Sequence, residues 1–246
     1  MDRSLYVGMT GASQIMAAQA VLAQNLANVS TTGFRTDLYA ISGAPISGPG
    51  FGTRVNAVAN MTGFSTETGP VQQTGAPLDV AVMGSGWLAV QAKDGTEAYT
   101  RGGDLHLTPD GMLVTAAGLP VLGDGGPVTI PPSDSVAIGS DGTVTIVPQG
   151  VGAKGASAIA RLKLVNPPEA QLVKGLDGLI RTKDGVPAPA DASVQVQAGA
   201  LEGSNVNAPR ALVEMIELAR LFDMQTRLMS SADQNAASAQ KLLSAA

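Results

Sequence analysis

Apolar residues recur at three- and four-residue steps between residues 4 and 34, which predicts a helix over most of this segment. The positions that form the pattern are Val7, Ala12, Ile15, Met16, Ala20, Leu22, Ala23, Leu26 and Ala27. No charged side chain occurs in the segment. A helix on the surface of a soluble monomer normally carries Lys or Glu on its outer face. The pattern therefore predicts that protein surrounds this helix, supplied either by other chains or by its own domain.

A second helix is predicted over residues 209–243, because Pro209 suits a first helical turn and no glycine or further proline follows. We expect Asn207 or Ser204 to cap its start. One row of residues has the alternating three- and four-residue spacing of a coiled-coil seam: Leu212, Met215, Ala219, Phe222, Thr226, Met229, Asp233, Ala236, Gln240 and Leu243. A second row at intervals of seven contains Leu221, Leu228, Asn235 and Leu242. Two rows indicate two packing neighbours, the N-terminal helix and another chain.

Between these helices the spacing changes to that of short strands. Glycine and proline interrupt residues 35–74, which predicts a connector with one or two strands, residues 53–59 being the best candidate. From residue 78 onward, β-rich runs are separated by turn residues. The runs cover residues 78–82, 87–90, 105–107, 112–114, 128–130, 136–138, 144–147 and 162–165.

Asp-Gly pairs lie between many of these runs, at Asp94, Asp110, Asp124, Asp141, Asp177 and Asp184. Asp-Gly suits the left-handed positions of tight hairpin turns. A calcium-binding repeat is the alternative, but the pairs are unequally spaced and share no period. We therefore predict hairpin turns.

These patterns together predict an α+β protein. The N-terminal helix (residues 1–34) and the C-terminal helix (residues 204–246) are expected to pair as a coiled-coil-like domain. A connector (residues 35–77) leads to an inserted, mainly β domain of short antiparallel strands (residues 78–203).

Composition narrows the classes of partner. The 246-residue chain has a formal net charge of −5 and no cluster of Lys and Arg, which argues against nucleic acid. It contains no cysteine, so it forms neither disulfides nor thiolate metal sites. Amide side chains interrupt the N-terminal helix too often for membrane insertion. The N-terminus also lacks the pattern of a cleaved secretory signal, so we expect a protein that stays inside the cell or leaves it uncleaved by another route.

Candidate chemistry is sparse. Residues 84–89 match the loose dinucleotide pattern Gly-x-Gly-x-x-Ala, but Lys93, Asp94 and Gly95 end the segment before a helix can form, so we predict a turn between two strands. His106 is the only histidine and is expected on the exposed side of a strand, without a second residue to complete a metal site or a catalytic pair. We predict no enzymatic activity, cofactor or metal. An enzyme would need a carboxylate pair facing a pocket, and a secreted β-rich adhesin would need an exposed platform built from Trp87, Tyr99 and Tyr39.

Several motifs resemble those of one family. Residues 24–35, Gln-Asn-Leu-Ala-Asn-Val-Ser-Thr-Thr-Gly-Phe-Arg, resemble the Asn-Leu-Ala-Asn-x-x-Thr-x-Gly-Phe signature of flagellar basal-body rod and hook proteins. The resemblance continues in family order through residues 78–82, 99–101, 113–115, 118–123 and 199–207. The opening residues 1–6, the Gly69-Pro70 pair and the total length are most similar to proximal-rod members, with distal-rod members as the close competitor and hook-type proteins more distant. Trp87-Leu88 and Pro209-Arg210 depart from the family pattern.

The resemblance implies a structural subunit of the proximal rod, a tubular drive shaft that transmits torque and conducts exported subunits. It implies that the flagellar type III export apparatus delivers the protein uncleaved to the periplasm, and that its partners are other copies and other rod proteins. Asn25, Asn28 and Gly33 match family positions and are expected to shape the exit from the first helix. The full set of residues expected at the assembly interface is Ile15, Leu22, Asn25, Leu26, Asn28, Gly33, Phe34, Leu212, Met215, Leu218, Phe222, Leu228 and Met229.

Overall fold

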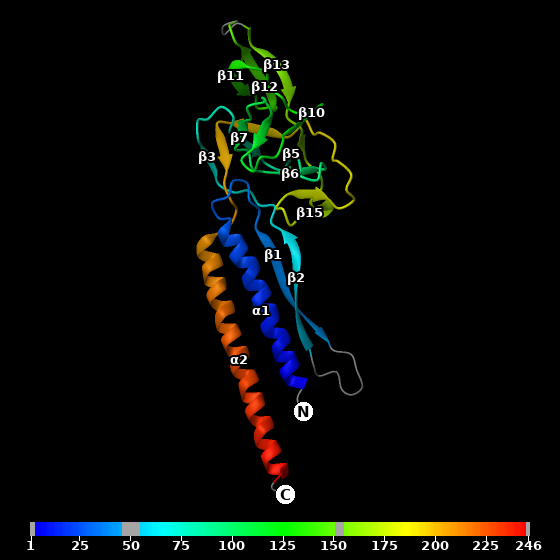
Figure 1. Ribbon diagram of the computed structural model, residues 1–246, viewed down its shortest axis with the longest axis vertical. Coiled ribbons are helices and arrows are strands. Elements are labelled where there is room, and N and C mark those ends of the chain that lie inside the picture. Colours follow the sequence, from blue (N-terminus) through cyan, green and yellow to red (C-terminus); the bar gives the residue numbers. More distant parts are fainter. Residues whose placement is uncertain (1–2, 46–54, 151–154, 245–246) are drawn as a thin grey trace. The chain divides into compact units, whose positions relative to one another are not determined.

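The computed structural model describes residues 3–45, 55–150 and 155–244 (Figure 1). The chain divides into two compact units. The helical unit contains Met1–Asn28, Asp37–Gly63 and Val206–Ala246, and the β unit contains Val29–Thr36 and Phe64–Asn205. The expected connector, residues 35–77, is therefore shared between the two units.

Two helices and two strands make up the described part of the helical unit: α1 (Arg3–Ala27), β1 (Asp37–Pro45), β2 (Val55–Phe64) and α2 (Ala208–Ser244). The side chain of Asn207 accepts a hydrogen bond from the Arg210 amide at 3.0 Å, which confirms the predicted cap of α2. β1 and β2 pair as a two-stranded sheet. The predicted strand at residues 53–59 lies in β2 from Val55 onward, whereas residues 53–54 lie outside the described residues.

α1 and α2 lie side by side and run in opposite directions (Figure 1). Near the C-terminal end of α1, Ala18 and Leu22 are buried against Leu218, and Tyr39 from β1 packs on the same cluster. Near the N-terminal end of α1, Gln225 donates a hydrogen bond to the Gly8 carbonyl at 3.2 Å. The two terminal helices thus pack against each other within one chain.

The face of α2 that α1 and β1 cover differs in part from the predicted seam. Ala211 and Leu218 are buried, whereas Leu212 and Ala219, which the spacing assigns to the seam, are exposed. Met215 and Phe222 are half-buried, as a seam position requires. One residue corresponds to a rotation of about 100° around a helix, so neighbouring positions cannot both face the same partner. The spacing identified the correct side of α2. Two seam positions, Leu212 and Ala219, however, each lie one residue after the buried residue that faces the partner.

The described part of the β unit contains short strands, and every strand pairing recorded within it is antiparallel. The strands are β3 (Val71–Gln73), β4 (Val80–Met83), β5 (Trp87–Gln91), β6 (Glu97–Thr100), β7 (Leu105–Leu107), β8 (Leu113–Thr115), β9 (Leu122–Gly123), β10 (Gly126–Pro127), β11 (Ser133–Ile138), β12 (Thr143–Pro148), β13 (Ser157–Arg161), β14 (Leu164–Val165), β15 (Leu172–Lys174), β16 (Ile180–Thr182), β17 (Gln195–Ala198) and β18 (Ala200–Glu202). A short 3₁₀ helix, η2 (Glu169–Gln171), precedes β15.

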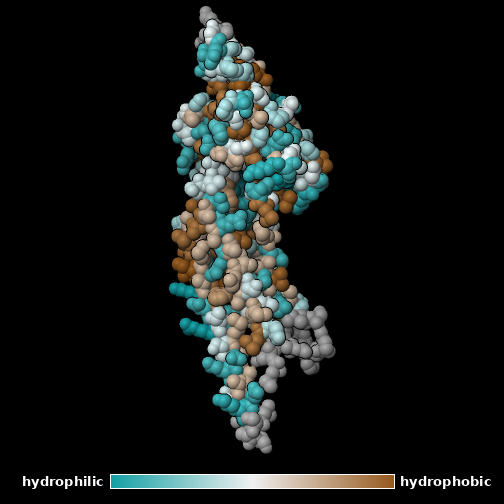
Figure 2. Space-filling model, in the orientation of Figure 1, coloured by the Kyte–Doolittle hydropathy of each residue, from teal (hydrophilic) through white to brown (hydrophobic). Residues whose placement is uncertain are grey.

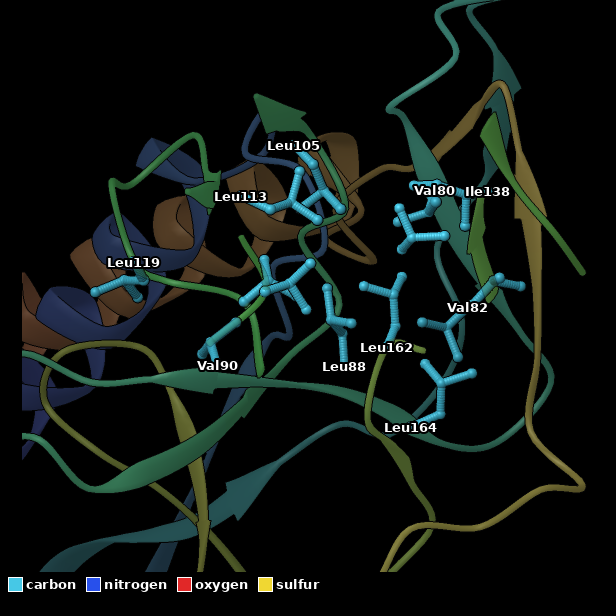
Figure 3. Close-up of a cluster of buried hydrophobic side chains, with 14 of the residues drawn as sticks. Val80, Val82, Leu88, Val90, Leu105, Leu113, Leu119, Ile138, Leu162 and Leu164 are labelled. Atoms are coloured by element: carbon cyan, nitrogen blue, oxygen red, sulfur yellow. The ribbon is translucent and has the colours of Figure 1, made fainter. Parts of the chain in front are cut away.

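The largest sheet has the strand order β14-β5-β6-β16-β15, and β11, β12 and β13 form a second sheet. The remaining strands pair in twos as β17-β4, β18-β3, β7-β8 and β10-β9. The sheets share a core to which β4, β5, β7, β8, β11 and β14 contribute side chains that point toward one another (Figure 3). This core includes Val80, Leu88, Leu113, Ile138 and Leu164. The predicted α+β fold with an inserted domain of short antiparallel strands is confirmed.

Two of the predicted strands need correction. Residues 128–130 form no strand, because only Thr129 makes an isolated bridge, to Met112. Of residues 162–165, only Leu164 and Val165 are in a strand. A run of apolar residues can fill a core without ladder partners on both sides, and Val128 does so while its amide bonds the Val121 carbonyl.

The Asp-Gly pairs join paired strands at every predicted position except Asp184, which follows β16 and does not lead into a strand that pairs with it. The turns are not of the type with two left-handed residues, because all residues with positive φ in the described part of the chain are glycines. Gly95 and Gly142 each donate a hydrogen bond to the carbonyl three residues earlier, at 2.9 Å. The preceding aspartates accept from the Thr96 and Thr143 amides, which stabilises each turn.

Candidate assembly surface

Most of the large apolar residues that are exposed in the described part of the chain belong to the helical unit. On α2 they concentrate in the first half of the helix, where Figure 2 shows hydrophobic residues gathered along one side. The residues are Leu212, Val213, Ile216, Leu221, Met224 and Leu228. Leu221 and Leu228 come from the row that the spacing assigned to a second packing neighbour. The side chain of Leu228 is 64% exposed, so α1 leaves this row uncovered.

Between residues 5 and 27, α1 has an exposed face without charge. Tyr6, Met9 and Met16 are the large exposed side chains on this helix. The exposed row continues with small or hydroxyl residues at three- and four-residue steps, through Ser13, Ala20, Ala23 and Ala27. The domain of the chain itself therefore does not enclose α1. A continuous uncharged row on a helix is typical of a surface that packs against another protein.

The expected interface residues fall into four groups. Leu22, Asn25 and Leu218 are buried inside the helical unit. Ile15, Leu26, Asn28, Met215, Phe222 and Met229 are half-buried in the same unit, and Leu212 and Leu228 are exposed there. Gly33 and Phe34 belong to the β unit. A neighbouring chain can contact the exposed residues directly, whereas the buried ones keep the helix pair in shape.

Asn25 and Asn28 close the C-terminal end of α1. The Asn25 side chain donates to the Asp37 carbonyl at 3.0 Å and accepts from the Asp37 amide at 2.9 Å, so it binds the backbone of β1 as a strand neighbour would. Asn28 donates to the Gln24 carbonyl at 2.9 Å, which satisfies one of the last carbonyls of the helix. These bonds explain why amides stand at the end of an otherwise apolar helix.

Gly33 has φ +68°, a conformation that favours glycine. A Cβ atom at this position would lie 2.2 Å from the Arg101 carbonyl carbon, so two backbone segments touch here. Phe34 follows, and the Lys174 ammonium lies 4.0 Å from the centre of its ring. In the structure both residues therefore make contacts inside the β unit.

Sequence reasoning missed a buried ionic group close to these residues. Arg35, Arg101 and Glu202 have almost no exposed surface, and Trp87 lies against both arginines. The only signal in the sequence is that Arg35 and Arg101 are the last residues of two family motifs, residues 24–35 and 99–101, which does not reveal burial. The same burial removes the aromatic platform that an adhesin would need, because Trp87 and Tyr99 are 4% and 1% exposed.

Two other predictions about the described residues can be checked. His106 is exposed on β7, as predicted. Residues 84–86 form the turn between β4 and β5, and no helix follows it, which confirms a turn in place of a dinucleotide loop. None of the described helices combines the length and the apolar character that a membrane span requires.

Comparison with known proteins agrees with the position of the motifs. Residues 5–35 match a family described as flagella basal body rod protein, residues 81–146 match the flagellar hook protein FlgE/F/G D1 domain, and residues 197–242 match the flagellar basal body rod FlgEFG protein C-terminal family. The flagellar basal-body rod protein FlgF of Escherichia coli is 42% identical over 250 residues, which cover 99% of each chain. The chain belongs to the FlgF family of flagellar basal-body rod proteins.

Other FlgF relatives include the protein of Caulobacter vibrioides, 34% identical over 94% of each chain. A protein named FlgG, from Buchnera aphidicola, is 30% identical over 95% of this chain and 97% of its own. The resemblance to proximal-rod members is thus confirmed. This FlgF-family chain is a structural subunit of the flagellar basal-body rod, and its relatives are structural proteins and not enzymes.

Proposed function

We propose that this FlgF-family subunit polymerises through the exposed apolar rows of α1 and α2, each of which binds a neighbouring rod subunit. The observation that carries the proposal is that α1 exposes Tyr6, Met9 and Met16 on a face that carries no charge between residues 5 and 27, although Ala18 and Leu22 of the same helix are already packed against α2. Exposed apolar rows of this length cost solubility unless protein covers them. In this arrangement α1 and α2 pair within each chain in the manner of a coiled coil, and their outer rows bind other chains.

Two different rows on one subunit support a helical tube. A contact between unlike surfaces repeats from one copy to the next and gives a ring or an open helix, depending on whether the rotation closes. We propose that copies of this chain and other rod proteins repeat in this way, and that the resulting tube transmits torque and conducts exported subunits. The absence of charge between residues 4 and 34 suits such a layer, because an inner wall without charge does not retain passing chains.

We further propose that the subunit reaches the periplasm through the flagellar type III export apparatus without cleavage. The apolar pattern of α1 supports this, since the segment that a signal peptidase would remove belongs to the proposed assembly surface. The subunit recovered from purified basal bodies is expected to have a mass that accounts for the residues before Val7. A smaller mass, corresponding to a polypeptide that starts at or after Val7, would contradict uncleaved export.

The assembly proposal is tested by Leu228→Asp. Leu228 is exposed, so the variant is expected to keep the helical circular dichroism of the wild type while incorporation into rods falls at least about tenfold, because a buried unpaired carboxylate opposes association. Gln234→Asp is the matched control, since Gln234 is also exposed and belongs to neither apolar row of α2. Incorporation is measured by labelling the subunit in purified basal bodies. Equal incorporation of both variants would refute the proposed surface.

A further inference from the structure

Three segments of the β unit continue directly into the helical unit, and all three meet in one place. We call them the crossing segments: residues 32–36, 64–69 and 199–205. The Gly33 amide donates to the Glu202 carbonyl at 2.8 Å, and the Ser65 amide donates to the Thr36 carbonyl at 2.8 Å. The Asn205 side chain accepts from the Thr36 amide at 2.8 Å and donates to the Glu67 carbonyl at 2.9 Å. Segments far apart in the sequence are thus joined by direct hydrogen bonds.

Behind these bonds lies a group that we call the arginine cluster: Arg35, Arg101, Glu202 and Trp87. The Glu202 carboxylate lies 2.7 Å from the Arg35 guanidinium and 2.9 Å from the Arg101 guanidinium. All three charged side chains are at most 2% exposed. The same carboxylate accepts a hydrogen bond from the Gly69 amide at 2.8 Å. Glu202 lies in the third crossing segment and thus contacts the other two, through Arg35 and Gly69.

The arginine cluster holds two positive charges and one negative charge. Backbone carbonyls supply further acceptors: Arg35 donates to Glu67 at 2.7 Å, and Arg101 donates to Val82 at 3.0 Å and to Gly84 at 2.6 Å. The Nε atoms of both arginines have no hydrogen-bond partner among the described residues. Both guanidinium groups instead lie over the Trp87 ring, at 5.6 Å and 5.2 Å from its centre. The negative face of the indole therefore provides part of the electrostatic stabilisation that a second carboxylate would otherwise supply to the two arginines.

Burial lowers the pKa of Arg101, Glu202 raises it, and Arg35 lowers it again. The Glu202 carboxylate, 2.9 Å from the Arg101 guanidinium, is therefore the charge that compensates for the burial of this arginine. Removal of one member of a buried ionic group is far more costly than removal of an exposed ion pair, because it leaves an uncompensated charge. The arginine cluster is therefore expected to hold the crossing segments together. They cannot separate without exposing a buried charge to solvent or leaving it without its ionic partner.

We propose that the arginine cluster positions the three crossing segments, so that force applied to any one of them is shared by all three at the point where they leave the β unit. This inference rests on the proposed function, in which subunits of a rotating rod carry load between their parts. Glu202 and Trp87 are positioning residues in this sense. They act through the crossing segments, and both side chains are buried within the β unit.

Glu202→Gln tests the proposal, because it keeps the shape of the side chain and removes its charge. In the purified full-length chain we expect hydrogen exchange at the amides of Gly33, Thr36 and Ser65 to accelerate at least about tenfold, while the amides of β5 and β12 keep their wild-type rates. Glu97→Gln is the matched control: Glu97 forms an ion pair of 2.8 Å with Lys163 in the same unit, but it contacts no crossing segment. The control is expected to leave all three amides unchanged.

Uniform acceleration over the whole β unit, or no acceleration at the three amides, would overturn the proposal. If Glu202→Gln does not fold, Trp87→Leu decides, because leucine keeps the apolar contact with the core and removes the ring face. We expect a selective acceleration of about threefold at the same amides, and an unselective or absent effect would again overturn the inference. Incorporation of Leu228→Asp is measured separately, so failure of the assembly surface and failure of the arginine cluster give different results.

Discussion

Tyr99 shows how much the surroundings of one residue can change its chemistry. Its side chain is buried, and its hydroxyl accepts from the Ala188 amide at 2.7 Å and donates to Glu97 at 3.1 Å. Burial raises the pKa of Tyr99 to about 12, the bond from Ala188 lowers it, and the charge of Glu97 raises it. The neutral hydroxyl is therefore the form that the folded β unit holds.

This raised pKa predicts an alkaline loss of stability. An unfolded tyrosine ionises near pH 10, so the stabilisation is complete below about pH 10 and is lost as the pH rises toward 12. We expect Tyr99→Phe to have a lower free energy of unfolding than the wild type at pH 8, because the Ala188 amide loses its acceptor. The difference in free energy between the two proteins is expected to narrow between about pH 10 and 12. Urea unfolding followed by Trp87 fluorescence measures both proteins. A difference in unfolding free energy that stays constant with pH would contradict the raised pKa of Tyr99.

At the scale of elements, α1 and α2 differ in what they need from a partner. Residues 4–27 of α1 carry no charge, whereas the first half of α2 carries Arg210, Glu214, Glu217, Arg220 and Asp223 among its apolar residues. Gly8 is buried where α2 comes closest, and a Cβ atom there would lie 2.8 Å from Met229 Cγ. The missing side chain at Gly8 therefore sets how closely the two helices approach.

Substitution of the two glycines of α1 tests this approach. Gly11→Ala is expected to stabilise the helical unit by up to about 1 kcal/mol, because a Cβ atom at Gly11 comes no closer than 3.4 Å to Gln225 and alanine favours the helix. Gly8→Ala is expected to gain nothing or to destabilise, since Met229 and Gln225 must move. Thermal unfolding followed at 222 nm measures the difference. An equal increase in the unfolding temperature of both variants would show that the helices do not meet at Gly8.

At the scale of the whole molecule, the two units differ in the size of their cores. The β unit buries side chains from many strands in a shared cluster, whereas the cluster between α1, α2 and β1 contains few fully buried residues. The stability of a region follows the apolar surface that it buries. We therefore expect the stability of the helical unit to depend on neighbouring subunits.

In dilute solution we expect fast amide exchange over residues 5–27 and 208–240, and slow exchange in the β unit. After assembly the same helical amides should become protected, because binding stabilises the folded form by mass action. Exchange followed by mass spectrometry on monomer and on isolated rods measures both states. Equal protection of the two units in the monomer would show that the helices need no neighbours, and would contradict the assembly proposal.

The family motif at residues 24–35 illustrates which details of the site were beyond prediction. The resemblance placed it at the exit from the first helix, but the spacing alone predicted a helix over most of residues 4–34, whereas α1 ends at Ala27, inside the motif. The bonds of Asn25 to β1 and the contact of Gly33 with Arg101 did not, because each depends on a partner that is distant in the sequence. The spacing of α2 likewise identified Met215 and Phe222, but it could not distinguish Leu218 from Ala219.

The order of apolar and polar residues by itself determined the two terminal helices, the inserted β domain and its Asp-Gly turns, since each follows from local preferences that act over a few residues. It also determined that the helices carry more apolar surface than one neighbour covers. Only the tertiary structure decided which row of α2 meets α1, which strands pair, and that Arg35, Arg101 and Glu202 share one buried site. These outcomes depend on side chains that are brought together by folding, and no local preference specifies which of several equally spaced partners will lie opposite.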